Sequence, residues 1–168
     1  SGAHNLENAL AAMAITDLAG ASSVAQTKAL QNFSGLEHRT EYVGTWNGVT
    51  WVNDSKGTNV GATLAAIKGV FEDSKGILIA GGVGKDADFS PLRSVIRDQA
   101  QATILFGQDA DKIASVIHGA SPLHIVTDLK AAIKLAKSLA ISGTKVLFSP
   151  ACASFDMFEN YQQRGQRF

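Results

Sequence analysis

The sequence has little cysteine and no excess of charge of either sign. Its single cysteine, Cys152, cannot form an internal disulfide, and a zinc site built from several cysteines is excluded. The 15 basic and 15 acidic side chains balance to a formal net charge of +0. Because no basic field exists to attract nucleic acid, we expect local groups to hold any charged ligand. No metal site is predicted, because metal-ligand spacing is missing among His4, His38, His118 and His124.

Long hydrophobic runs are also missing. The apolar stretches are short or rich in alanine, and polar residues interrupt them. The sequence therefore contains no transmembrane span, and it carries no signal peptide or lipidation motif. We expect a cytoplasmic monomer that does not insert into membranes. The 45% hydrophobic content is sufficient for the core of one globular domain.

The first 37 residues differ in pattern from the rest. Apolar residues between Leu6 and Leu18 recur at helical spacing, and Gly20 is a helix stop. A second helix follows, with Ser22 or Ser23 as its cap. Two short helices bury little surface alone, so we assign residues 1–37 to the end of a larger region or a linker, and residues 38–168 to a separate domain. The chain is expected to be a piece of a longer protein.

The second region has the pattern of an α/β domain. Two β-rich runs, residues 41–46 and 49–52, flank Asn47-Gly48, which predicts a hairpin. Short apolar strands then alternate with amphipathic helices. The strands are expected at residues 76–80, 103–106, 124–127 and 145–148, and the helices at residues 60–71, 91–99, 110–118, 129–140 and from Asp156 onward. The alternation predicts a Rossmann-like three-layer sandwich with a mostly parallel sheet, a β-hairpin at its edge and two preceding helices.

Three polar loops follow strands of this predicted sheet. They are residues 53–59, 81–88 and 149–154. In doubly wound sheets, ligands bind outside the carboxyl ends of the strands. The loops therefore define a candidate binding site.

The glycine-rich loop has several interpretations. Residues 82–87 match the dinucleotide pattern G-x-G-x-x-A, with Asp109 downstream as the acidic residue. The match is weak, because the next helix signal comes only at Ser90-Pro91 and a phosphate would miss the helix N-terminus. A P-loop is excluded, since Asp86 stands where serine or threonine is required. A tight turn that aims Lys85 at an anion, and a plain turn with a solvated lysine, both remain open.

The other two loops offer polar groups of different kinds. Asp54 can accept hydrogen bonds from ribose hydroxyls, and Lys56 suits a phosphate or carboxylate. Thr58 and Asn59 are both candidates for the cap of the next helix. Residues 149–154 lack the G-x-S-x-G nucleophile elbow, so their hydroxyls are expected to donate to a ligand, and Cys152 to be a small buried residue.

Five motifs stand in an order known from one enzyme family. They are residues 4–12, 35–39, 53–59, 81–89 and 149–156. Over essentially its whole length the chain resembles the Mur ligase family, and within it the members that add D-glutamate. Sister ligases and folate polyglutamate ligases differ most from it at residues 55–59.

The resemblance implies a three-domain ligase of peptidoglycan precursor synthesis. The first domain of such ligases holds the UDP-sugar, the second is an ATPase with a P-loop, magnesium ligands and a modified lysine, and the third closes over the site. Residues 1–37 correspond to the tail of the ATPase domain or a linker, and residues 38–168 to the third domain. ATP activates the carboxylate of UDP-N-acetylmuramoyl-L-alanine as an acyl phosphate, which the amine of D-glutamate then attacks. The Mg²⁺ ligands would lie in the central domain, so the chain alone is expected to be inactive.

The resemblance also implies roles for particular residues. Lys85, Thr58 and Ser154 match residues that bind the carboxylates of D-glutamate, and Lys56 matches a lysine near the phosphate and amino-acid side of the cleft. Tyr161 belongs to the same set, at a position where many members have phenylalanine. Nucleotide contacts are implied for Asn8 at the adenine and for Arg39 and Asp54 at the phosphate and ribose. Val83 departs from the aspartate of some members.

Two other functions remain open. A non-catalytic Rossmann-type nucleotide-binding module would bind NAD or ATP without any response to glutamate. A sister ligase would bind L-glutamate or another amino acid instead.

Overall fold

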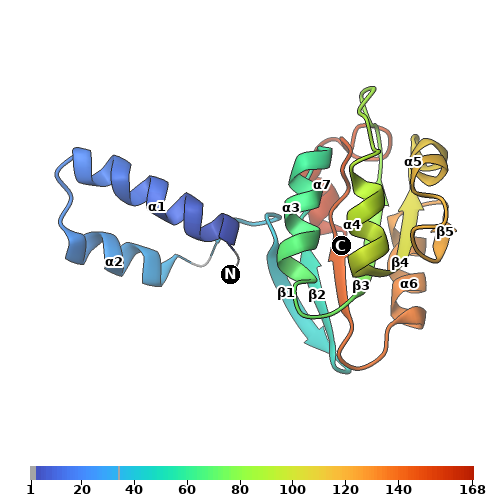
Figure 1. Ribbon diagram of the computed structural model, residues 1–168, viewed down its shortest axis with the longest axis horizontal. Coiled ribbons are helices and arrows are strands. Elements are labelled where there is room, and N and C mark those ends of the chain that lie inside the picture. Colours follow the sequence, from blue (N-terminus) through green and yellow to red (C-terminus); the bar gives the residue numbers. More distant parts are fainter. Residues whose placement is uncertain (1–2, 34) are drawn as a thin grey trace. The chain divides into compact units, whose positions relative to one another are not determined.

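The structure, a computed structural model, describes residues 3–33 and 35–168, with side chains described from Leu6 onward in the first helix. The chain divides into two compact units, Ser1–Leu36 and Glu37–Phe168. The first contains two helices, and the second contains the sheet and the remaining helices (Figure 1).

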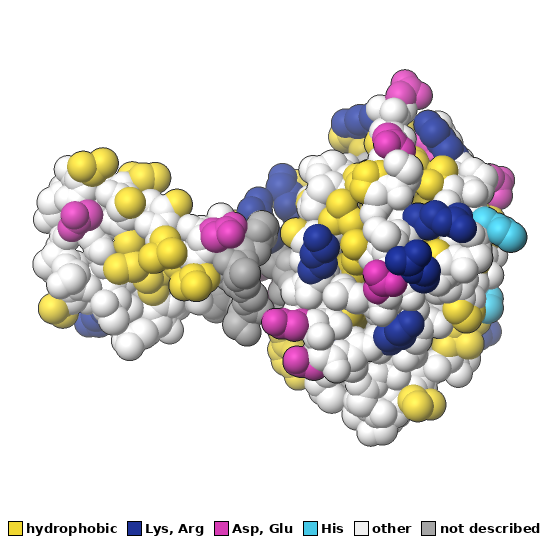
Figure 2. All heavy atoms as spheres, in the orientation of Figure 1, with side chains coloured by type: hydrophobic (Ala, Val, Ile, Leu, Met, Phe, Trp, Pro, Cys, Tyr) yellow, Lys and Arg dark blue, Asp and Glu magenta, His cyan; other side chains and the backbone are white. Residues whose placement is uncertain are grey.

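The helical unit consists of α1 (Ala3–Leu18) and α2 (Ser23–Asn32). Gly20 has a φ of +82°, a left-handed conformation that glycine adopts freely after a helix end. Ser22 caps α2, because its hydroxyl oxygen accepts from the amide of Ala25 at 3.3 Å. Figure 2 shows hydrophobic side chains at the surface of this unit. On α1, Leu6 is 62% exposed and Leu18 is 92% exposed. The two helices alone therefore bury little of their apolar surface.

The sheet has six strands in the order β1-β2-β6-β3-β4-β5. The strands are β1 (Glu41–Trp46), β2 (Val49–Asn53), β3 (Gly76–Gly81), β4 (Ala100–Phe106), β5 (Leu123–Ile125) and β6 (Lys145–Phe148). Among the six strands of the described residues, only the β1–β2 pair is antiparallel, and the other pairs of strands are parallel. The predicted parallel sheet with a hairpin edge is confirmed. The strand predicted at residues 124–127 was wrong at its end, because Ile125 ends β5 and residues 126–128 lead into the next helix.

Helices cover both faces of the sheet (Figure 1). On one face, α3 (Val60–Val70), α4 (Leu92–Gln99) and α5 (Ala110–Ile117) contribute to one buried apolar cluster. On the other, α6 (Leu129–Leu139) packs together with Phe158 and Phe168 in a second cluster. The central strands lie between the clusters, and β3 is buried at all six positions, as a strand covered on both faces should be.

The last helix begins later than the sequence predicted. It is α7 (Tyr161–Gln166), capped by Asn160, whose side-chain oxygen accepts from the amide of Gln163 at 2.8 Å. The preceding segment forms a turn instead, in which the amide of Phe158 donates to the carbonyl of Ser154 at 2.9 Å. The prediction of a helix from Asp156 was wrong because this turn directs Phe158 into the core, and the strong cap comes only at Asn160.

Candidate functional site

The polar loops meet at one edge of the sheet. They follow β2, β3 and β6, which are neighbours and parallel, so their carboxyl ends lie together. Backbone hydrogen bonds join the loops directly. Val83 and Ala153 exchange two of them, at 3.0 and 2.9 Å, and the amide of Ala151 donates to the carbonyl of Gly57 at 2.9 Å. Val83 contributes only its backbone to this bridge, so the bridge does not depend on the side chain at that position.

Asp54 is buried beneath the loop that follows β2, with 5% of its surface exposed. Its carboxylate accepts from the amide of Thr40 at 3.0 Å and from the hydroxyl of Ser149 at 2.7 Å. Burial raises the pKa of this carboxyl, and the hydrogen bonds from Ser149 and Thr40 partly offset that effect. Gly57 packs closely here, because a Cβ at that position would lie 2.7 Å from the Ser149 hydroxyl oxygen.

Arg39 and Asp54 lie close enough for their charges to interact. The positive charge of the exposed Arg39 is one of the smaller influences that lower the pKa of Asp54. Arg39 therefore presents its guanidinium to solvent, whereas Asp54 faces inward. Since two carboxylate oxygens offer about four acceptor sites, Asp54 keeps some capacity to accept further hydrogen bonds.

Lys56 and Thr58 lie at the surface of the same loop. The ammonium of Lys56 is 4.1 Å from the centroid of the Tyr161 ring, a cation–π distance. Asn59, rather than Thr58, caps α3, because its side-chain oxygen accepts from the amide of Ala62 at 2.9 Å. The half-buried Thr58 hydroxyl is therefore not used as a helix cap.

Lys85 projects from a tight turn in the glycine loop. The turn is held by Asp109, whose carboxylate accepts from the amide of Gly84 at 2.6 Å. Asp109 was the acidic residue of the dinucleotide interpretation, and its carboxylate here contacts the turn itself. Lys85 has a φ of +50° and is exposed, with its ammonium 5.5 Å from the centroid of the Phe155 ring.

Ser154 and Cys152 occupy the loop after β6. Ser154 is 2% exposed, and within the described residues its hydroxyl has no hydrogen-bond partner. Cys152 is fully buried, as predicted. Burial, the largest influence, raises the pKa of its thiol to about 12, so the thiolate needed for nucleophilic chemistry is not available near neutral pH.

Arg164 is a central residue that the sequence did not reveal. It is fully buried in α7 and donates hydrogen bonds to Ser55 and to the carbonyl of Cys152. Burial lowers the pKa of its guanidinium to about 10, which leaves it charged at neutral pH. No local signal separates it from the exposed Arg167 three residues later, because its burial depends on loops distant in the sequence.

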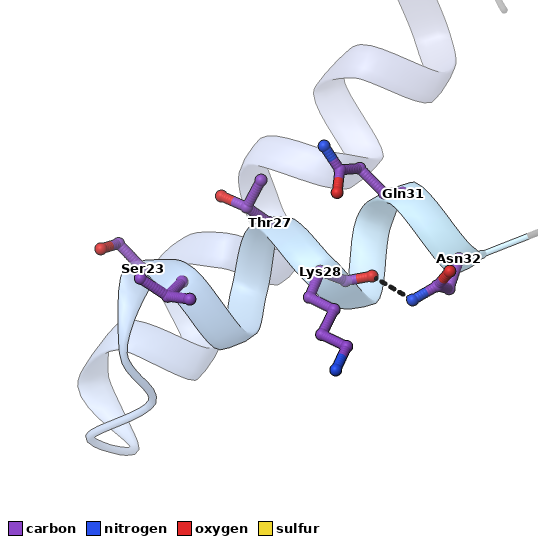
Figure 3. A pocket seen from close by; sticks show the side chains of 6 residues that line it. Ser23, Thr27, Lys28, Gln31 and Asn32 are labelled. Carbon is purple, nitrogen blue, oxygen red and sulfur yellow. Dashed lines mark hydrogen bonds between the residues drawn. The ribbon is translucent and has the colours of Figure 1, made fainter.

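Asn8 belongs to the helical unit, where it is exposed on α1. The same unit has an open hollow along one side of α2 (Figure 3). Its lining residues are Ser23, Val24, Thr27, Lys28, Gln31 and Asn32. The side-chain amide of Asn32 donates to the backbone carbonyl of Lys28 at 2.9 Å at one end of this hollow. None of the predicted site residues lines it.

The described part of the chain has neither a cluster of metal-ligating side chains nor a helix that could span a membrane. Residues 3–33 and 35–168 contain no group of three or more His, Cys, Asp or Glu side chains that could hold a metal ion. Across the same residues, no helix combines the length and apolar character needed to cross a membrane.

Comparison with known proteins identifies the family. The model of the Mur ligase glutamate ligase domain matches residues 38–152. The chain belongs to this Mur ligase domain family. The match includes Arg39, Asp54, Lys56, Thr58 and Lys85.

Individual relatives extend the similarity over the whole chain. The chain is 53% identical over 168 residues to the UDP-N-acetylmuramoylalanine–D-glutamate ligase of Nitrosococcus oceani, covering 100% of the chain and 37% of that ligase. For the ligase of the same name from Saccharophagus degradans, the identity is 52%, with coverage of 100% and 37%. The chain thus spans little more than a third of these relatives.

The fold of the family also occurs in more distant structures. A crystal structure of UDP-N-acetylmuramate-alanine ligase from Thermotoga maritima superposes with a TM-score of 0.73 at 21% identity, over 100% of this chain and 37% of that one. At this identity the likeness shows the shared fold alone, and it agrees with the predicted fold class.

Proposed function

We propose that the chain is the C-terminal part of an ATP-dependent ligase that adds D-glutamate to UDP-N-acetylmuramoyl-L-alanine in peptidoglycan precursor synthesis. The observation that carries the proposal is the 53% identity along the entire chain to a relative named for that reaction. We further propose that the complete ligase works in the cytoplasm as a monomer.

The proposed reaction forms one amide bond. ATP phosphorylates the carboxylate of the UDP-linked alanine. The amine of D-glutamate then attacks the acyl carbon, and phosphate leaves as the bond between the acyl carbon and the phosphate oxygen breaks. The attacking amine loses a proton as the amide forms. A site that excludes water and presents fixed cations and donors would stabilise the charge that develops.

The chain's own contribution would be to bind and orient D-glutamate. This substrate has two carboxylates, and the candidate site offers ammonium groups and hydroxyls from three loops. Lys56 and Thr58 follow β2, Lys85 follows β3, and Ser154 follows β6. The Val83–Ala153 bridge connects the second and third of these loops, which favours a fixed spacing between Lys85 and Ser154. A charge-assisted hydrogen bond to each carboxylate contributes about 1.5–3 kcal/mol.

Tyr161 would support this site through its ring. Its face lies 4.1 Å from the ammonium of Lys56, a contact that phenylalanine could also make. The carbonyl of Tyr161 accepts from the hydroxyl of Ser55 at 2.8 Å, which ties the residue to the same loop. Tyr161 is therefore proposed to orient Lys56 rather than to rely on its own hydroxyl.

Nucleotide contacts are proposed for Asn8, Arg39 and Asp54. The exposed guanidinium of Arg39 suits a phosphate, and the exposed amide of Asn8 suits an adenine. Asp54 would contribute its remaining acceptor capacity to ribose, and it also holds the amide of Thr40 beside Arg39. Mg²⁺ would supply charge neutralisation at the ATP phosphates, and we assign no Mg²⁺-binding residue to the described part of this chain.

A titration followed by NMR tests the proposal. Isotope-labelled chain is titrated with D-glutamate and separately with L-glutamate, with succinate as an anion control. Shifts at Thr58, Lys85, Ser154 and their neighbours, with D-glutamate preferred, support an amino-acid site of the proposed kind. Preference for L-glutamate supports a sister ligase, and an equal response to all three anions supports a generic anion pocket.

A response to ATP or NAD without any response to glutamate favours a nucleotide-binding module. If the chain alone responds to nothing, the titration is repeated on a complete ligase that carries it as its C-terminal part. If D-glutamate causes no chemical-shift changes in that ligase, the proposal is contradicted. We also expect the chain alone to show no ATP turnover, which a phosphate-release assay with the UDP-linked substrate checks.

A further inference from the structure

The turn that carries Lys85 has an unfavourable backbone conformation. Lys85 has a φ of +50° and Asp86 a φ of +59°, so two successive residues with side chains are left-handed. Such residues avoid this region because the Cβ crowds the backbone. Strained segments persist only where surrounding contacts hold them. The contacts around this turn therefore fix the position of the Lys85 backbone, from which its side chain extends.

Asp109 makes two hydrogen bonds to the turn. Its amide donates to the carbonyl of Gly82 at 3.0 Å, and its carboxylate accepts from the amide of Gly84 at 2.6 Å. The second bond is the shorter of the two. The backbone of the turn lies close to Asp109, since a Cβ on Gly84 would be 3.2 Å from the Asp109 carboxylate. Gly84, which Asp109 holds through its amide, directly precedes Lys85 in the chain.

The carboxylate of Asp109 is used in an unusual way for its position. Asp109 is the residue before α5, where aspartate commonly accepts from an amide in the first turn of its own helix. Its side chain makes no such cap here, and accepts from Gly84 instead. Because the Asp109 side chain bonds to the glycine loop and not to its own helix, we infer that it has a role in that loop.

Asp109 is itself fixed from the loop after β6. The amide of its neighbour Gln108 donates to the carboxylate of Asp156 at 2.9 Å. Asp156 follows Ser154 by two residues, so hydrogen bonds lead from the Ser154 loop through Gln108 and Asp109 to the Lys85 turn. The Val83–Ala153 bridge is a second connection between the loops that follow β3 and β6.

We propose that Asp109 is a positioning residue, which clamps the Gly82–Gly84 turn so that the Lys85 ammonium faces the amino-acid substrate. The proposal rests on the proposed function, because it takes Lys85 as a ligand of a D-glutamate carboxylate. Asp109 acts through the backbone of Gly84 and does not touch the substrate. Its loss should therefore weaken substrate binding without affecting the nucleotide.

Three variants of a complete ligase carrying this chain test the role. Asp109→Ala removes the acceptor, and Asp109→Asn keeps an oxygen at the same place. Asp111→Ala removes the same charge from an exposed site in α5. We expect Asp109→Ala to raise the KM for D-glutamate about tenfold, with the KM for ATP unchanged. Asp109→Asn should restore most of the loss, and Asp111→Ala should match wild type.

A direct readout of the clamp is the amide of Gly84. In NMR spectra of the chain, Asp109→Ala should move the Gly84 proton resonance upfield and speed its hydrogen exchange, whereas Asp109→Asn and Asp111→Ala should change it little. An unchanged Gly84 amide in Asp109→Ala overturns the clamp. Equal increases in KM for both substrates overturn the positioning role and indicate general damage.

The two proposals fail in different ways. A wild-type ligase that does not use D-glutamate overturns the proposed function, and with it the role of Lys85. A wild-type ligase that does use D-glutamate, together with an unchanged KM in Asp109→Ala, overturns the positioning role alone.

Discussion

The guanidinium of Arg164 donates to the carbonyl oxygen of Ser55 at 2.9 Å. Two of its nitrogens also donate to the carbonyl of Cys152, each at 3.1 Å, and a third reaches the Ser55 hydroxyl at 3.1 Å. Ser55 follows β2 and Cys152 follows β6, so one buried side chain from α7 joins two loops of the candidate site. Within the described chain, all these acceptors are uncharged oxygens.

Replacing Arg164 should destabilise the fold strongly. Arg164→Met removes the donors and leaves two buried carbonyl groups without them, for which we expect a loss of about 2–4 kcal/mol in the free energy of unfolding. Arg164→Lys keeps the charge but cannot reproduce the forked geometry, so it should recover only part of the loss. Urea unfolding of the chain measures both. Arg167→Met, at an exposed position just after the same helix, is the matched control. Equal stability of Arg164→Met and Arg167→Met would contradict the role of Arg164.

Cys152 should be unreactive until the protein unfolds. It is fully buried, and burial raises the pKa of its thiol to about 12, so both access and thiolate are lacking at pH 8. As the only cysteine, it gives an unambiguous signal in an alkylation assay followed by mass spectrometry. We expect negligible modification by iodoacetamide in buffer and complete modification in 6 M guanidinium chloride. Rapid modification of the folded chain at pH 8 would show that the loop after β6 opens readily.

The sequence was sufficient to predict the elements whose causes are local. The apolar run at Lys145–Phe148 predicted β6 with its bounds, and Asn47-Gly48 predicted the hairpin turn. The helix predicted from residue 129 is α6, and it is capped by Asp128, whose carboxylate accepts from the amide of Ala131 at 2.8 Å. Each of these features depends on residues within a few positions of one another, so a pattern along the chain contains the required information.

The features that the sequence did not predict depend on distant partners. Arg164 and Ser55 are separated by 109 positions, and nothing local distinguishes this arginine from a solvated one. Asp109 was considered only as the acidic residue of a dinucleotide-binding pattern, because its contact with Gly84 exists only once β3 and β4 pair. The residue roles that came from family resemblance stay predictions, since bringing loops together does not reveal what they bind.

The pH dependence of stability should carry a signature of Asp54. Burial raises the pKa of Asp54 in the folded state above the ordinary value of 3.8. The folded state therefore binds this proton more tightly than the unfolded state does. The contribution of Asp54 to stability is therefore greatest at low pH and is lost as pH rises through the folded-state pKa. We expect the stability of wild type relative to Asp54→Asn to increase as pH falls from 7 toward 4. Urea unfolding across that range measures the difference.

Asp88 provides a control of opposite sign. Hydrogen bonds from the amide and hydroxyl of Ser90 lower the pKa of this exposed carboxyl. Its contribution to stability is present above the ordinary pKa and is lost as pH falls through the folded-state value. Relative to Asp88→Asn, wild type should therefore lose stability as the solution is acidified. If both aspartate variants followed the same trend, burial would not dominate at Asp54.

Substitution of Lys85 gives the sharpest test of the amino-acid site. In a complete ligase carrying this chain, Lys85→Ala should raise the KM for D-glutamate strongly and change the KM for ATP little. The lost charge-assisted hydrogen bond contributes about 1.5–3 kcal/mol, or roughly ten- to a hundredfold in KM. Steady-state kinetics with each substrate varied in turn measures the two constants. Lys130→Ala, an exposed lysine on α6, is the control and should match wild type. Equal loss for both substrates would refute a specific role for Lys85, because a residue that binds only one carboxylate cannot affect the nucleotide to the same extent.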